Sequence, residues 1–303
     1  MILIITHKLD FTADFLINKL NDRKIEYRRL NCEDILSTNY SFEYHPDMTF
    51  SIMGVPKYTS VWFRRTLLPD LDIELPQERK YILGEVEAFM KNIFSILDAK
   101  WVSPPREVYH AENKLYQLKL AKKLGFKIPE TLVTSDKEEL KNFFGKHDHI
   151  IVKPIFQTRI SSPENAEFIF TNRVTKEQID SLNSFDLSPC IFQREIEKTV
   201  ELRITVVNGQ TFAAQVKSQE DEETKTDWRK KKLAFTIFEL PSHIHQLCID
   251  LVREMGLVFG AIDMILSPDG TYTFLEINPN GQWVWIETET GLKISDAIIK
   301  ELL

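Results

Sequence analysis

Two carboxylates and one amide are brought together by the last hairpin that the sequence predicts. Asp263 lies on a strand over about residues 258–266, while Glu276 and Asn278 lie on and just after a strand over about 271–277. Side chains two positions apart on a strand share a face, so the three polar side chains point to the same side of the hairpin. Oxygen ligands of this kind, with positions left for water and phosphate, are suited to Mg²⁺ or Mn²⁺.

The register of this hairpin decides how close the two carboxylates are. If four residues form the turn, Leu266 pairs with Thr271 and Asp263 lies opposite Phe274. Glu276 is then the diagonal neighbour of Asp263 and within its reach. Two carboxylates this close repel each other unless a proton or a cation lies between them. The alternative, polar residues on a solvated hairpin face, is weakened by the apolar residues that alternate with them.

A magnesium site of this kind usually holds phosphates and therefore needs cationic partners. Lys153 ends an apolar strand and Lys114 stands in the first turn of a helix, although each lysine taken alone is more often a surface residue. Glu201 and Arg203 share one face of a strand, where Glu201 can accept hydrogen bonds from ribose and Arg203 can contact a phosphate or a carboxylate. The strand ending in Gln193-Arg194-Glu195-Ile196 has the form of an adenine-facing linker.

The elements that carry these residues alternate between strands and helices. The chain opens with a strand, a helix and a strand, which implies a parallel sheet. Pro104-Pro105 breaks the chain, Gly125 is placed to end a helix, and Asn208-Gly209 is a strong hairpin signal. Strands are expected at about 2–5, 25–30, 61–65, 150–154, 190–196, 202–207, 211–218, 258–266 and 271–277, and helices at 11–23, 78–97, 111–124, 175–183 and 242–255.

Composition narrows the class of protein. The 303 residues suffice for about two domains, and the net charge of −7 disfavours nucleic acid and anionic membrane surfaces as partners. The three cysteines are widely separated and predict neither a disulfide framework nor a zinc site. No apolar stretch is long enough to span a bilayer, and the N-terminal run lacks the features of a signal peptide. The sequence therefore predicts a cytoplasmic protein.

The order and approximate spacing of these residues resemble the ATP-grasp ligases, and the resemblance covers essentially the whole chain. Within that superfamily the chain resembles the macrocyclising peptide ligases of graspetide (microviridin-type) biosynthesis. The resemblance implies an α/β (α+β ATP-grasp) fold, with a pre-ATP-grasp parallel-sheet domain at 1–104, a central lobe at 105–185 and a C-terminal lobe with the metal site at 186–303. The strings that support the subfamily are Val61-Trp62-Phe63-Arg64-Arg65, Asn113-Lys114, Ser218-Gln219, Asp227-Trp228-Arg229 and Asn278-Pro279-Asn280-Gly281-Gln282-Trp283.

The resemblance also implies the cofactors and the reaction. An Asp or Glu side chain of a ribosomal precursor peptide, which has a leader and an acidic core, would be phosphorylated by ATP. A Thr or Ser hydroxyl or a Lys amine of the same peptide would then attack, closing an ω-ester or ω-amide ring. The implied contacts are Lys114 and Lys153 with phosphates, Gln193, Glu195 and Ile196 with adenine, Glu201 with ribose, and Asp263, Glu276 and Asn278 with two Mg²⁺ ions, or Mn²⁺ in their place.

Two other functions stay open, as does a homodimer. One is an ATP-grasp ligase that adds amino acids to a small molecule or to a protein C-terminus. The other is a non-catalytic module that binds a nucleotide or a peptide. The convergence of Asp263, Glu276 and Asn278 argues against the second, because a degenerate site does not need it.

The tetrahedral intermediate of such a reaction needs a cation where negative charge develops. Some ATP-grasp enzymes place an arginine two residues before the metal-binding aspartate, where this chain has Ala261. Arg203 and Arg229 are therefore the expected catalytic residues, although Arg229 also belongs to a basic run of a kind that is usually solvated. The adjacent Trp228 favours a packed position, because an indole in a charged loop usually packs on something.

Contacts with the peptide are expected at four residues. Arg64 and Arg65 end a strand of the first domain and either contact the acidic core or form interdomain salt bridges. Lys217 and Trp228 lie in the segment 212–232, which the resemblance suggests for docking of the leader. Within it, the charged run 220–232 is expected to be an exposed loop.

Glycine is scarce, and its absence from one loop bears on the phosphates. The chain has 10 glycines, none in a G-x-G-x-x-G or P-loop pattern. In the ATP-grasp superfamily the loop after the strand lysine commonly carries glycines, whereas residues 154–163 carry none. Because other residues give the backbone less freedom to approach phosphates closely, coverage should depend on side chains, with Arg159 as the candidate.

Overall fold

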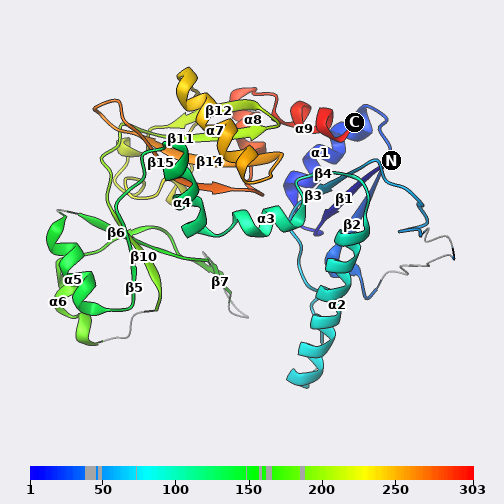
Figure 1. Ribbon diagram of the computed structural model, residues 1–303, viewed down its shortest axis with the longest axis horizontal. Coiled ribbons are helices and arrows are strands. Elements are labelled where there is room, and N and C mark those ends of the chain that lie inside the picture. The colour runs from blue at the N-terminus through cyan, green and yellow to red at the C-terminus, as the bar shows by residue number, and fades with distance from the viewer. Residues whose placement is uncertain are drawn as a thin grey trace.

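The computed structural model describes residues 1–37, 46, 50–72, 74–147, 149–156, 159–161, 166–184 and 188–303. Within this part of the chain there are a parallel sheet of four strands, antiparallel sheets of four and five strands, and a two-stranded ribbon (Figure 1). The three larger sheets define an N-terminal domain, a central lobe and a C-terminal lobe. None of the described helices is long and apolar enough to cross a membrane.

The N-terminal domain is built on the parallel sheet, with strand order β2-β1-β3-β4. Its elements are β1 (Ile2–Thr6), α1 (Phe11–Asp22), β2 (Tyr27–Asn31), η1 (Cys32–Asp34), β3 (Ser60–Phe63), α2 (Pro76–Ile96) and β4 (Lys100–Val102). Asp10 caps α1 by accepting hydrogen bonds from the backbone N–H groups of Thr12 at 3.1 Å and Ala13 at 3.3 Å. The parallel pairing of β1 with β2 confirms the predicted strand-helix-strand start.

The central lobe carries the sheet β5-β10-β6-β9 and has a hydrophobic core of its own. Its elements are β5 (Thr131–Thr134), α5 (Lys137–Lys146), β6 (Ile150–Pro154), β7 (Arg159–Ser161), β8 (Ala166–Phe168), β9 (Asn172–Arg173), α6 (Lys176–Asp180), η2 (Leu182–Ser184) and β10 (Cys190–Arg194). The boundary proposed between residues 185 and 186 precedes β10, which pairs with β5 and β6 in the central sheet. The sequence did not predict this pairing because β10 is far from β5 and β6 along the chain.

The C-terminal lobe holds the sheet β13-β12-β11-β14-β15. Its elements are β11 (Val200–Val207), β12 (Gln210–Val216), η3 (Ser218–Glu220), η4 (Trp228–Lys230), β13 (Thr236–Ile237), α7 (Ser242–Glu254), β14 (Phe259–Leu266), β15 (Tyr272–Asn278), α8 (Val284–Thr290) and α9 (Ile294–Leu302). The hairpin at Asn208-Gly209 is confirmed. The helix expected at about 111–124 is present as α4 (Lys114–Leu124), which begins later because the backbone of Asn113 is extended, and it is preceded by a separate helix that was not predicted, α3 (Pro105–Ala111). Helix α4 packs against β15 and α7 and ends, as predicted, at Gly125 in the left-handed conformation.

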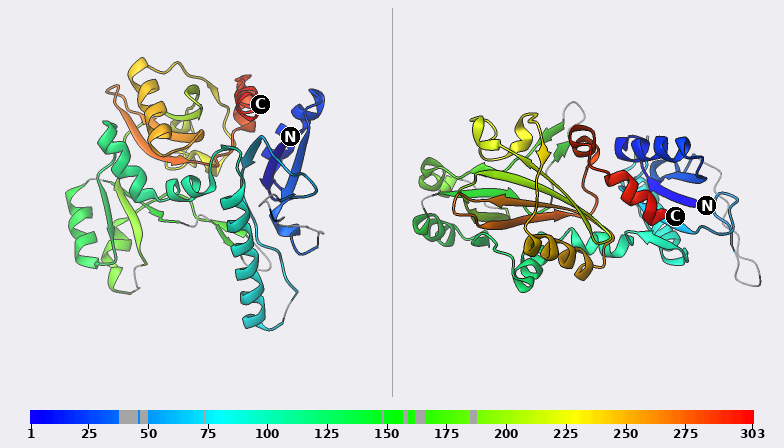
Figure 2. Two further views of the ribbon diagram at one scale, coloured as in Figure 1. Left: turned by 45° about the vertical axis from the view of Figure 1, so that its right-hand side comes forward. Right: turned by 90° about the horizontal axis from the view of Figure 1, so that it is seen from above.

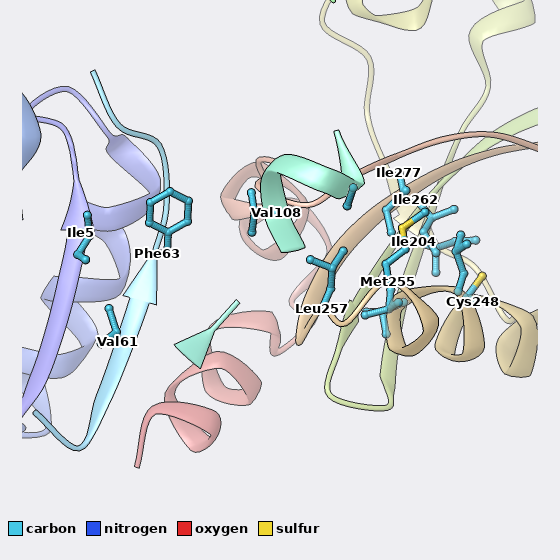
Figure 3. Close-up of a cluster of buried hydrophobic side chains, with 14 of the residues drawn as sticks. Ile5, Val61, Phe63, Val108, Ile204, Cys248, Met255, Leu257, Ile262 and Ile277 are labelled. Atoms are coloured by element: carbon cyan, nitrogen blue, oxygen red, sulfur yellow. The ribbon is translucent and has the colours of Figure 1, made fainter. Parts of the chain in front are cut away.

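The N-terminal domain and the C-terminal lobe share hydrophobic clusters. Figure 3 shows one of them, which runs from Phe63 in β3 through Val108 in α3 to Ile277 in β15. A second cluster buries Trp283 against α1, with its ring centroid 5.9 Å from that of Phe15. These two parts therefore form one packed unit, and the central lobe, with its separate core, extends from it (Figure 2).

The charged segment 220–232 is not the exposed loop that the sequence predicted. Thr224 and Asp227 are buried, and Trp228 packs on Phe235 and Trp285 with ring centroids 5.1 and 5.3 Å away. The prediction rested on charge content alone. It was wrong because partners that are distant in the sequence bury the middle of the segment.

Candidate active site

A row of three charged side chains crosses the middle of the C-terminal sheet. Arg203 on β11 pairs with Asp263 on β14, and Asp263 pairs in turn with Glu276 on β15. Asn278 lies on the same face, opposite Ala261. The predicted shared face of Asp263, Glu276 and Asn278 is therefore present, and it also carries Arg203.

The register of the hairpin differs from the predicted one. The backbone N–H of Ser267 donates to the carbonyl oxygen of Thr271 at 2.9 Å, so the turn between them has three residues rather than the predicted four. Leu266 therefore pairs with Tyr272 and not with Thr271. A β-bulge beside Asp263 then shifts the pairing by one further residue. Glu276 is consequently the direct neighbour of Asp263 and not its diagonal neighbour. Because the two shifts add up to an even number of residues, each side chain stays on its predicted face.

Arg203 is buried and binds Asp263 closely. Its Nη1 donates to both carboxylate oxygens of Asp263 at 3.0 Å, and its Nη2 donates to the carbonyl oxygen of Gln282 at 3.2 Å. Gly281 leaves room for this group, since a Cβ at that position would lie 2.6 Å from Nη2. Burial raises the pKa of Asp263 in spite of Arg203, and the adjacent Glu276 raises it further. A cation between the two carboxylates would relieve that repulsion.

Two lysines approach Glu276 from another side. Nζ of Lys114 lies 3.7 Å from Glu276 Oε2 and donates to the carbonyl oxygen of Pro154 at 3.1 Å. Burial lowers the pKa of Lys153, and the nearby Glu276 opposes that effect. Burial alone would raise the pKa of Glu276, but Lys153 and Lys114 outweigh it, so this pKa is lowered. Glu276 is thus held ionised, as a metal-binding carboxylate must be.

The donor set on this face fits a hard divalent cation. Asp263 and Glu276 supply carboxylate oxygens and Asn278 supplies an amide oxygen, ligands that Mg²⁺ accepts together with phosphate and water. Oδ1 of Asn278 accepts a hydrogen bond from the backbone N–H of Asn280 at 3.0 Å, which orients the amide. No three His, Cys, Asp or Glu side chains form a metal-binding group among the described residues. Any metal here would therefore depend on the amide and on a phosphate ligand.

A cavity between the central and C-terminal lobes gathers most of the residues predicted to bind ATP. Side-chain oxygens of Glu195 accept hydrogen bonds from Arg173 at 2.7 and 2.8 Å, and its backbone N–H donates to the carbonyl oxygen of His149 at 3.0 Å. Glu201 accepts a hydrogen bond from Lys198 at 2.7 Å, and burial raises the pKa of Glu201 in spite of this lysine. The predicted residues on the cavity wall are Lys153, Gln193, Glu195, Ile196, Glu201, Trp228, Arg229, Asp263 and Glu276.

Arg229 is held at the wall of this cavity by Asp227. The buried carboxylate of Asp227 accepts hydrogen bonds from Nε of Arg229 at 2.8 Å and from Nη2 at 2.6 Å. It also accepts one from the backbone N–H of Thr171, in the central lobe, at 3.2 Å. These hydrogen bonds from Arg229 to Asp227 raise the pKa of Arg229 above its already high usual value. Arg229 therefore lines this cavity, with 41% of its side chain exposed.

A second cavity, of about 580 Å³, lies between the N-terminal domain and β15. The carboxyl edge of a parallel sheet, where ligands bind in folds of this kind, contributes residues to its wall. The charged residues on that wall are Arg64, Arg65, Glu112, Lys114, Arg229 and Glu276. Arg229 and Glu276 line the first cavity as well, so the two cavities meet at these side chains.

The two arginines at the end of β3 have different surroundings. Arg64 is buried, with Nε 3.2 Å from Oδ2 of Asp10, and its Nη1 donates to the carbonyl oxygen of Asn280 at 3.4 Å. Because Asn280 follows β15, this arginine joins the N-terminal domain to the C-terminal lobe. Arg65 is exposed and lines the second cavity.

Other residues lie away from the predicted positions or were missed. Lys217 is exposed, pairs with Glu220 and lines neither of these cavities. The side chain of Arg159 lies outside the described residues. Sequence reasoning did not single out Glu112, and it quoted Asp227 only within the string Asp227-Trp228-Arg229, without a role. For Asp227 the available signal was its position two residues before Arg229, at the start of a helical turn, whereas nothing in the sequence around Glu112 distinguishes it.

Comparison with known proteins identifies the class. The model of the RimK-like ATP-grasp domain matches residues 111–302, and the chain belongs to this family. A relative of known activity, the tetrahydromethanopterin:α-L-glutamate ligase of Methanocaldococcus jannaschii, is 21% identical over 209 residues, which are 67% of this chain and 69% of that protein. The predicted ATP-grasp ligase class is confirmed.

Two solved structures match over nearly the whole chain. The macrocyclase MdnC of Microcystis aeruginosa MRC, bound with precursor peptide MdnA, is 28% identical and covers 99% of this chain and 98% of its own, with a TM-score of 0.85. The RiPP-associated ATP-grasp ligase of Chryseobacterium gregarium, in complex with ADP and a leader and core peptide, is 30% identical and covers 99% and 94%, with a TM-score of 0.86. These matches confirm the predicted fold and the resemblance to peptide macrocyclases.

Proposed function

We propose that this chain is an ATP-dependent peptide macrocyclase. It phosphorylates Asp or Glu side chains of a ribosomal precursor peptide and closes ω-ester or ω-amide rings with Thr, Ser or Lys side chains. The observation that carries this proposal is that the two cavities meet at Arg229 and Glu276. A phosphoryl group passing from a nucleotide in one cavity to a carboxylate in the other would move between these side chains.

The nucleotide would lie between the central and C-terminal lobes. Bound Mg²⁺ would neutralise charge on the triphosphate. An Mg²⁺ ion held by Asp263 and Glu276 would offset the repulsion between these two neighbouring carboxylates. The proposed contacts are Lys114 and Lys153 for the phosphates, Gln193, Glu195 and Ile196 for adenine, Glu201 for ribose, and Asp263, Glu276 and Asn278 for two Mg²⁺ ions, or Mn²⁺ in their place.

The peptide would lie in the second cavity. Arg65 is exposed there and would attract an acidic core, and the buried Arg64 would add positive charge to the same wall. Arg203 and Arg229 would stabilise the negative charge that develops on the acyl oxygen as the nucleophile adds to the acyl carbon, a term that is usually large. For the leader we retain the segment 212–232 as the docking surface, with Lys217 exposed on it and Trp228 packed beneath.

Three further features belong to the proposal. The chain would divide into parts at residues 1–104, 105–185 and 186–303, with β10 joining the sheet of the central part. It would act in the cytoplasm as a homodimer. Light scattering on the purified protein tests the oligomeric state, since a monomeric mass contradicts it.

The proposal is tested with a candidate precursor encoded beside the gene, with a core rich in Thr or Lys and in Asp or Glu. Incubation with ATP and Mg²⁺ should form ADP and remove one water from the peptide mass for each ring. Asp263→Asn and Glu276→Gln should abolish ADP formation. Asp250→Asn, which changes a carboxylate on α7 that pairs with Arg253, should not. An unchanged peptide mass with a verified precursor contradicts the proposal.

The same mass spectrum separates the alternatives. A ligase that adds amino acids, which the similarity to a glutamate ligase favours, increases the mass of its acceptor. A binding module without activity forms no ADP. Macrocyclisation is distinguished from both by the loss of water.

A further inference from the structure

The attacking hydroxyl or amine must lose a proton, and most charged groups in the peptide cavity are already engaged. Arg64 contacts Asp10, and Arg229 contacts Asp227. Glu276 lies opposite Asp263 and close to Lys114, in the proposed metal site. None of these groups is free to receive a proton.

Glu112 is the exception among the carboxylates of this cavity. It follows α3, two residues before Lys114, and lines the cavity together with Arg65. Within the described residues its side chain forms no hydrogen bond or salt bridge, and Arg65 is the nearby charge. Glu112 is exposed towards the cavity, yet partial burial of its carboxyl still raises its pKa, and Arg65 only partly opposes this. A carboxylate shifted towards neutrality is a better general base than an ordinary one.

The two other titratable groups on the wall are less suited to this task. Nδ1 of His7 is buried against the protein without a partner among the described residues, so that nitrogen does not reach a substrate. Burial raises the pKa of the Tyr109 phenol, which keeps it protonated. Glu112 is therefore the carboxylate on this wall that has no side-chain hydrogen bond or salt bridge among the described residues.

We propose that Glu112 is the general base that accepts the proton of the attacking hydroxyl or amine. This rests on the proposed function, in which the peptide carboxylate has become an acyl phosphate and ADP has formed. As the nucleophile's oxygen or nitrogen bonds to the acyl carbon, its proton passes to the carboxylate of Glu112. The bond from the acyl carbon to the phosphate oxygen then breaks and inorganic phosphate leaves. The proton on Glu112 is finally released to solvent.

The test separates formation of the acyl phosphate from its use. Hydroxylamine attacks acyl phosphates with its own lone pair and needs no protein base, so hydroxamate formation on the precursor reports the first step alone. We expect Glu112→Gln to form hydroxamate at close to the wild-type rate and rings about 100-fold or more slowly, the usual contribution of a general base. Glu112→Asp should recover part of the ring formation. Glu107→Gln, which changes a glutamate of α3 outside both cavities, should match the wild type.

Two results overturn the assignment. One is ring formation by Glu112→Gln at the wild-type rate. The other is equal loss of hydroxamate and rings, which indicates a structural role. If the wild-type protein forms neither product from a verified precursor, the proposed function itself fails and the role of Glu112 falls with it. Hydroxamate without rings in the wild-type protein instead contradicts macrocyclisation while retaining carboxylate activation.

Discussion

A methyl group at position 281 should disable the site although no charged residue is substituted. Gly281 lies against Arg203, which binds Asp263 in the row described above. A Cβ there would be 2.5 Å from Cβ of Ala261 and 2.6 Å from Nη2 of Arg203. The Ala261 contact cannot be relieved by rotating a side chain, so Gly281→Ala has to move the backbone of β14 or of the loop after β15.

The size of the effect follows from these distances. Ordinary contacts with a Cβ begin at 3.4 Å. Ala261 must therefore retreat by 3.4 − 2.5 = 0.9 Å and Arg203 by 3.4 − 2.6 = 0.8 Å. Overpacking of this kind costs about 1–3 kcal/mol of stability. Misplacing catalytic groups by about 1 Å costs about 100-fold in rate. Because Asp263 is bound through Nη1 of Arg203, we expect both effects in Gly281→Ala.

The assay is the rate of ADP formation at saturating ATP, Mg²⁺ and precursor, with thermal unfolding measured in parallel. Gly84→Ala is the matched control, since Gly84 lies inside α2 and a Cβ there meets nothing within 4 Å. That variant should keep full activity and gain about 0.5–1 kcal/mol, because alanine is the better helix former. A wild-type rate for Gly281→Ala would refute the argument that close packing at this glycine positions Arg203.

Three further predictions concern stability and reactivity. Arg64→Leu leaves Asp10 as a buried unpaired charge, so the free energy of unfolding of this variant in urea should fall by about 3–5 kcal/mol. The control Arg79→Leu breaks an exposed pair with Asp70 and should cost less than about 1 kcal/mol. Equal costs in the two variants would contradict this prediction. Burial raises the pKa of Asp227, but the hydrogen bonds from Arg229 outweigh this effect, so the pKa is lowered. The ionised carboxylate therefore stabilises the folded protein above the unfolded pKa of about 3.9, and this stabilisation is lost as the pH falls through the lower folded pKa. Chemical denaturation should show Asp227→Asn to be less stable than the wild type at pH 7 and equally stable in strong acid. Burial raises the pKa of Cys32 and Cys248 to about 12. At pH 8 a thiol reagent should therefore modify Cys190 in the native protein and all three cysteines after unfolding. Rapid modification of all three cysteines in the native protein would count against this burial.

The hairpin that carries Asp263, Glu276 and Asn278 shows what local pattern predicts and where it stops. Residue types and the two-residue period placed Asp263, Glu276 and Asn278 on one face, and the structure agrees. The turn was predicted with four residues, but Gly270 adopts φ +82° and closes a three-residue loop of the common type that ends in a left-handed residue. The bulge beside Asp263 depends on the packing of β14 between β11 and β15. Neither feature is determined by the hairpin sequence alone.

Non-local partners account for the other errors. The run 220–232 has the composition of a solvated loop, yet Asp227 binds Thr171 of the central lobe and Trp228 packs on Trp285. Short elements such as β4 were missed because three residues carry too little periodicity. Glu112 was missed for a related reason. Its interest comes from the cavity that the N-terminal domain forms with β15, and no local motif encodes that contact.

The separate core of the central lobe has a consequence for how the site is assembled. Asp263 and Glu276 lie in one sheet of the unit that the N-terminal domain and the C-terminal lobe form together, whereas Lys153 belongs to the central lobe. Two described contacts connect that lobe to the reacting groups: Lys114 to the carbonyl oxygen of Pro154, and Asp227 to the backbone N–H of Thr171. If the central lobe moved, the position of Lys153 relative to Glu276 would change, while Asp263 and Glu276 would keep their pairing within one sheet. Because Asp227 also orients Arg229, the same movement of the central lobe would act on the arginine that faces both cavities.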